Sequence, residues 1–93
     1  MIIVDAHCDT ITKILESGEN LYKNKCHIDI ERMRKAGSYV QFFAAFISPE
    51  YYHNSPKKCA VRIIGGLCKQ IDMYNDRILL CYNYNDVERA LYL

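Results

Sequence analysis

Hydrophobic residues follow two different periods along this chain. Short, nearly continuous apolar runs are typical of buried strands, whereas apolar residues at i, i+3 and i+4 are typical of amphipathic helices. We expect strands at residues 2–4, 39–47 and 78–82. We expect helices at residues 11–17, 30–36, 56–74 and 86–93. Strands that alternate with helices predict an α/β fold with a parallel sheet and right-handed crossovers.

Residues that start and stop helices support this division. Gly18 and Gly37 stand where the first two helices should end. Asp29 is the expected N-cap of the second helix. Ser55 and Pro56 open the third as N-cap and first helical residue.

Three further features concern the interiors and ends of these elements. Gln41 is the one polar residue inside the second apolar run; its amide either faces a polar site or, as we expect, bonds to neighbouring backbone. Gly65 and Gly66 cost the third helix about 1 kcal/mol each relative to alanine, which close approach to a neighbouring element would offset. Asn85 with Glu88 resembles a capping box for the last helix.

The first apolar run ends in three residue types that bind metals, His7, Cys8 and Asp9. Side chains at i and i+2 of a strand share a face, so His7 and Asp9 should project together and Cys8 the other way. An imidazole and a carboxylate so placed can hold one divalent cation, and α/β proteins build sites at the carboxyl ends of strands. Two structural roles stay open: Asp9 or Thr10 as a helix N-cap, and His7 as a buried, hydrogen-bonded histidine.

The other histidines are interpreted as structural or surface residues. His27 and Asp29 repeat the His-x-Asp spacing, but no strand leads into them and Asp29 precedes a helix. His53 lies in a loop before the third helix.

Composition narrows the class of protein. The 93 residues are 51% hydrophobic and 25% charged, which suits one small globular domain. A net charge of +1 gives no reason to expect nucleic acid or an anionic membrane surface as a partner. Five cysteines without a C-x-x-C pair exclude a zinc knuckle and a thioredoxin-like motif. With neither a secretory signal nor an apolar run of membrane-spanning length, we expect a cytoplasmic protein with reduced thiols.

Three apolar strands do not make a closed sheet. A parallel sheet buried on both faces needs helices on both sides or closure into a barrel, and a (β/α)8 barrel needs about 250 residues. We therefore interpret residues 1–93 as the N-terminal portion of a single TIM-like (β/α)8 barrel domain. The rival is a small open α/β domain, completed by self-association into a homo-oligomer.

Three stretches in this order resemble the membrane dipeptidase (renal dipeptidase) family of metallopeptidases. Residues 4–10 (Val-Asp-Ala-His-Cys-Asp-Thr) are similar to the family's opening Asp-x-His-x-Asp segment. Residues 27–37 are like the helix and glycine that follow it, and residues 40–46 are like the second barrel strand. The resemblance covers essentially the whole chain, with its specific part in residues 4–46.

The resemblance implies a zinc-dependent enzyme that hydrolyses the peptide bond of dipeptides through a metal-bridged water. His7 and Asp9 match the family's metal ligands from the first strand. The bridging glutamate and two further histidines of the binuclear zinc site have no match here, and Glu88 lies in a predicted helix. We therefore expect the isolated 93 residues to lack peptidase activity and to bind zinc weakly.

Two alternatives remain. One is a different amidohydrolase-like barrel, such as a deaminase or lactonase; those families usually carry His-x-His here, so Asp9 argues against them. The other is a non-catalytic α/β module that binds a partner through its open sheet edge.

Overall fold

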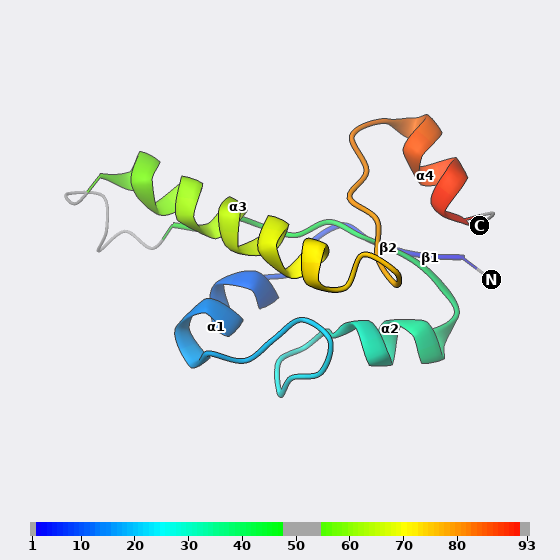
Figure 1. Ribbon diagram of the computed structural model, residues 1–93, viewed down its shortest axis with the longest axis horizontal. Helices are drawn as coiled ribbons and strands as arrows, with labels where there is room; N and C mark the ends of the chain where they lie inside the picture. The colour runs from blue at the N-terminus through cyan, green and yellow to red at the C-terminus, as the bar shows by residue number, and fades with distance from the viewer. Residues whose placement is uncertain (1, 48–54, 92–93) are drawn as a thin grey trace.

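The computed structural model describes residues 2–47 and 55–91. These residues form a small mixed α/β unit with four helices and a two-stranded sheet, which confirms the predicted α/β class (Figure 1). The elements are β1 (Ile2–Asp5), α1 (Thr10–Ser17), α2 (Ile30–Ala36), β2 (Ser38–Gln41), α3 (Pro56–Met73) and α4 (Tyr84–Leu91). None of the described helices is long and apolar enough to span a membrane.

The sheet is parallel, as predicted. Ile2 lies opposite Ser38, and the register continues to Asp5 opposite Gln41. Beyond the strands, the Phe42 N–H donates to the Asp5 carbonyl at 3.0 Å, and the Ala44 N–H donates to the Cys8 carbonyl at 2.9 Å. The segments that follow β1 and β2 therefore stay side by side past the strand ends.

Most of the predicted helix signals act as expected. Gly18, with a φ of 78°, ends α1, and the Asp29 carboxylate caps α2 by accepting the Arg32 N–H at 2.8 Å. Pro56 opens α3 in its first turn. The predicted capping role of Ser55 is wrong, because its side chain makes no capping hydrogen bond and its φ is 56°.

The core lies where α1, α2 and α3 meet one face of the sheet. Its buried apolar residues are Cys8, Ile11, Ile14, Leu21, Ile28, Ile30, Met33 and Ile63. Tyr39 and Phe43 also pack against this cluster; they belong to the β2 segment, which is β2 together with the residues 42–47 that follow it. Figure 1 shows the long helix α3 running past α1, and the two helices are in contact.

The close approach predicted for the glycine pair of α3 is found at one of the two positions. A Cβ atom on Gly66 would lie 2.7 Å from a terminal methyl carbon of Leu15 in α1. Gly65 faces open space. Gly66 therefore allows α1 and α3 to touch, whereas Gly65 has no such role.

On the opposite face of the sheet, β1 is uncovered within the described residues, while α4 contacts β2. Ile2 and Val4 share this face of β1, and they are 51% and 62% exposed. Phe42 and Phe46 are also more than half exposed. The predicted burial of both strand faces is therefore wrong here, because a parallel sheet buries both faces only when elements cover both.

The third predicted strand, at residues 78–82, is absent from the described structure. Two of its amides are used locally: the Ile78 N–H donates to the Tyr74 carbonyl, and the Tyr82 N–H donates to the Asp86 carboxylate. The second strand is shorter than predicted, because residues 42–47 continue past β2 without regular structure. With two strands, the described residues do not form a barrel.

The last helix starts two residues earlier than predicted. The Asn83 side chain accepts the Asp86 N–H at 2.9 Å, while the Asp86 carboxylate accepts the Tyr82 N–H at 3.0 Å. The Asn83 side chain is therefore the cap of α4, and the Asp86 carboxylate bonds to the residue before it rather than to the Asn83 N–H, as a regular capping box would. The capping box predicted at Asn85 and Glu88 is therefore wrong, because both residues lie inside the helix.

Candidate metal-binding site

The turn between β1 and α1 brings the predicted metal ligands together. Residues 6–9 have no regular structure and connect Asp5 to Thr10. The Nε2 atom of His7 lies 3.3 Å from Oδ1 of Asp9, and the two side chains are 66% and 50% exposed. The pair therefore stands at the carboxyl end of β1, open to solvent.

The cysteine between the two ligands is directed into the core, as the strand period predicted. Cys8 is buried and belongs to the same apolar cluster as Ile11. Burial raises the pKa of the Cys8 thiol, and the nearby polar groups of Thr10 oppose this only in part. The thiol therefore stays protonated near neutral pH, which makes it a poor metal ligand.

The two structural alternatives for this pair are excluded by the geometry. Asp9 occupies the N-cap position of α1, but its side chain makes no capping hydrogen bond. Its carboxylate faces His7 instead. His7 is exposed rather than buried, so it is not a core histidine.

The second His-x-Asp shows what a structural aspartate looks like. Asp29 is buried, and its carboxylate accepts the N–H groups of Asn24 and Arg32 and the Nε–H of Arg32, at 2.8 to 3.1 Å. Burial alone would raise the pKa of Asp29, but these hydrogen bonds and the guanidinium charge outweigh it and lower the pKa. The structural interpretation of Asp29 is therefore confirmed.

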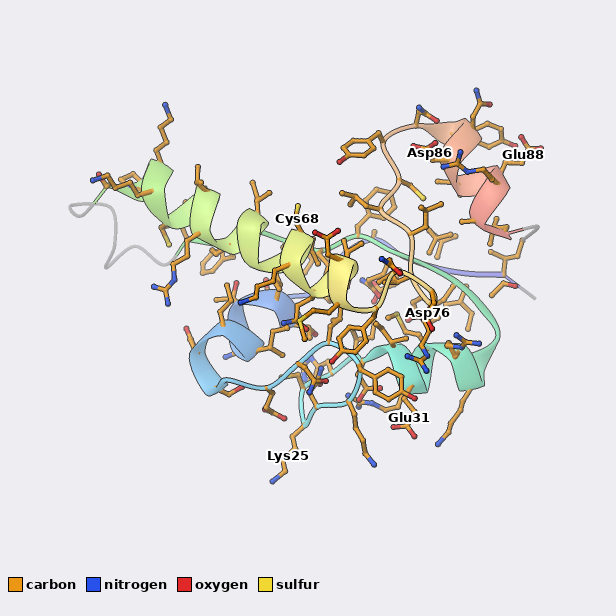
Figure 2. All side chains as sticks on the ribbon, viewed as in Figure 1. Lys25, Glu31, Cys68, Asp76, Asp86 and Glu88 are labelled. Atoms are coloured by element: carbon orange, nitrogen blue, oxygen red, sulfur yellow. The ribbon has the colours of Figure 1, made fainter. Side chains whose placement is uncertain are left out.

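The spacing of His7 and Asp9 suits one tetrahedral zinc ion. Ligand atoms about 2.1 Å from zinc, at a tetrahedral angle, lie about 3.4 Å from each other. A zinc site needs about four ligands, and this pair supplies two. Across residues 2–47 and 55–91, no three His, Cys, Asp or Glu side chains gather as a metal site. Figure 2 shows Glu88 on α4, well away from the start of α1 where the pair lies. His53 falls outside the described residues.

Sequence reasoning missed the hydrogen bonds that hold the ligand turn. The Oδ1 atom of Asp5 accepts the His7 N–H at 3.2 Å. The Nε2 atom of Gln41 donates to the Phe42 carbonyl at 3.0 Å and to the Asp5 carbonyl at 3.4 Å, which confirms that its amide bonds to backbone. The sequence did offer a signal for the first of these bonds. An aspartate side chain commonly accepts a hydrogen bond from the backbone N–H two residues later, and Asp5 and His7 have that spacing.

Compared with models of protein families, with curated proteins and with solved structures, the chain gives no significant match.

Proposed function

We propose that this chain is the N-terminal portion of a zinc-dependent dipeptidase, in which His7 and Asp9 bind one metal of a binuclear site. The single observation that carries the proposal is the convergence of the His7 imidazole and the Asp9 carboxylate at the end of β1. A carboxylate at a helix N-cap position normally caps the helix, but that of Asp9 does not.

The finer fold proposal is a TIM-like (β/α)8 barrel. Its support is the parallel register of β1 and β2 and the contacts that α2 and α4 make with β2. In such a barrel the other face lines the interior and is filled with branched side chains. Ile2 and Val4 on the uncovered face are residues of that kind.

The chain's own residues have two tasks in this mechanism. The His7 imidazole would bind the metal through Nε2, and Asp9 would supply a negatively charged oxygen that partly neutralises the ion. Bound zinc would lower the pKa of a water molecule and polarise the carbonyl of the dipeptide substrate. Cys8 packs in the core and takes no part.

Metal titration tests the proposal. Binding of Co²⁺ to the 93-residue chain, followed by visible absorption and by calorimetry, should be weak and should disappear in His7→Ala and Asp9→Ala. His27→Ala is the matched control, since His27 is also an exposed histidine two residues before an aspartate. The proposal fails if His27→Ala weakens binding as much as His7→Ala, or if the wild-type chain binds no metal.

Catalysis is a separate readout. The zinc-supplemented chain should not hydrolyse dipeptides, because two ligands leave the metal weakly held. Dipeptide turnover that His7→Ala abolishes, or stoichiometric sub-micromolar zinc affinity, would show that these residues already hold a complete site.

A further inference from the structure

The aspartate that ends β1 contacts the ligand turn through its side chain and the neighbouring strand through its backbone. Its Oδ1 accepts the His7 N–H at 3.2 Å, and its carbonyl accepts the Phe42 N–H at 3.0 Å. Asp5 is therefore fixed to the sheet and in turn fixes the backbone of the first metal-ligating residue.

Gln41 holds the same point from the opposite strand. Its Nε2 reaches the carbonyls of Asp5 and Phe42, and it lies directly across the register from Asp5. A third contact, from the Ala44 N–H to the Cys8 carbonyl, holds the middle of the turn. The turn that carries His7 and Asp9 is thus bound to the β2 segment on both sides of His7.

We propose that Asp5 is a positioning residue for the His7–Asp9 pair and that Gln41 supports it. This inference rests on the proposed metal site. Asp5 does not bind the metal; its carboxylate orients the His7 backbone so that the imidazole meets Asp9. Partners that hydrogen-bond the ligating side chain itself typically change metal affinity 10- to 100-fold when removed, and we expect a partner of the ligand's backbone to fall at the low end of that range.

The test compares two substitutions at Asp5. Asp5→Asn keeps a side-chain oxygen that can accept the His7 N–H, whereas Asp5→Ala removes it. Asp5→Ala should weaken Co²⁺ binding about 10-fold or more, and Asp5→Asn should stay within about 3-fold of wild type. Asp76→Asn, at a solvent-exposed aspartate outside the turn, controls for the lost negative charge.

A second measurement needs no metal. In NMR spectra of the metal-free chain, the His7 amide should exchange with solvent about 10-fold faster in Asp5→Ala, with no such change in Asp5→Asn. If Asp5→Ala does not fold, Gln41→Leu takes its place in both measurements. We expect Gln41→Leu to lose less Co²⁺ affinity than predicted for Asp5→Ala, and its His7 amide to exchange faster than in wild type.

The outcomes separate this inference from the proposed function. Equal loss of Co²⁺ affinity in Asp5→Asn and Asp5→Ala would show that the negative charge of Asp5 supports metal binding directly. That result would overturn the positioning role. An unchanged His7 amide in Asp5→Ala would overturn it as well. Loss of metal binding in His7→Ala but not in Asp5→Ala would leave the proposed function standing and refute the inference alone.

Discussion

Asp9 and Asp29 each precede a helix, α1 and α2 respectively, yet their carboxylates have different partners. Asp29 is surrounded by three N–H donors and is buried with them. Asp9 is half exposed and faces an imidazole. Local sequence alone treats both as N-caps, so the decisive difference is the set of donors that the fold brings to each carboxylate.

The buried carboxylate of Asp29 should make stability depend on pH. Its folded-state pKa lies below the unfolded value of about 3.9, so the charged form stabilises the fold above that pH. This contribution is lost as the pH falls through the folded-state pKa. Asp29→Asn should lower the free energy of unfolding at pH 7 by about 1–3 kcal/mol.

Urea unfolding between pH 7 and pH 2 measures this effect. The difference between Asp29→Asn and wild type should shrink as the pH falls below the unfolded-state pKa, because the wild-type carboxylate then begins to take up a proton. Asp76→Asn is the control at an exposed aspartate. A constant difference across the range would mean that Asp29 stabilises by shape rather than by charge.

Gln70 makes a long-range hydrogen bond that no sequence pattern predicted. Its Oε1 accepts the N–H of Leu21 at 2.9 Å, and Leu21 is fully buried. Gln70→Ala should lower the free energy of unfolding by about 1–3 kcal/mol, because it leaves a buried donor without its partner. Lys69→Ala, at an exposed neighbour on α3, should change it far less in the same urea titration.

At the scale of elements, the contact between α1 and α3 depends on the missing side chain of Gly66. Gly65→Ala should stabilise the protein by about 1 kcal/mol, since its helical position faces open space. Gly66→Ala gains the same helix propensity but must displace the end of the Leu15 side chain, and we expect this overpacking to cost about 1 kcal/mol, the low end of its usual range.

Thermal unfolding of the two single variants distinguishes the glycines. Gly65→Ala should melt above wild type, and Gly66→Ala should melt below Gly65→Ala. A Leu15→Ala background should remove the difference between them. Equal melting temperatures in the Leu15-containing chain would show that the helices separate without penalty.

The helices were more predictable than the strands for a physical reason. Helix starts and stops depend on local residues such as Gly18 and Asp29, and both act as predicted. Strands need a neighbour to complete their hydrogen bonds, and residues 78–82 lack one because Ile78 and Tyr82 are bonded locally. The α4 cap was missed because Asn83 and Asn85 are equally suitable capping residues.

Only the part of the site at the end of β1 could be predicted from the sequence. The period of the β1 run placed His7 and Asp9 together and Cys8 apart, and the structure agrees. The support from Gln41 depends on the pairing of two strands, so no local pattern discloses it. Residues that would complete the metal site do not occur near the pair within the described residues.

The whole molecule is less well buried than its size allows. It exposes 6846 Å², whereas a compact protein of 10.9 kDa exposes about 5,600 Å². The uncovered sheet face contributes to this excess through Val4 and Phe42. The stability of the chain therefore depends mainly on the cluster between the helices and the other face.

Substitutions on the two faces of the sheet should have very different effects on the free energy of unfolding. Val4→Lys should change the free energy of unfolding by less than about 0.5 kcal/mol, because Val4 is 62% exposed. Ile14→Ala should reduce it by about 2–5 kcal/mol, because Ile14 is fully buried. Urea unfolding compares them, and a large loss in Val4→Lys would show that this face is covered in solution.

The half-buried stack of two tyrosine rings beside the core has an optical consequence. The rings of Tyr22 and Tyr74 are 5.6 Å apart between centroids, and the Arg77 guanidinium lies 4.9 Å from the centre of the Tyr22 ring. Because the sequence contains no tryptophan, tyrosine emission is not lost by energy transfer to an indole. Coupled rings in a fixed arrangement give near-ultraviolet circular dichroism. All eight tyrosines contribute to that signal, and part of it should therefore be lost when the loop after α1 leaves the end of α3.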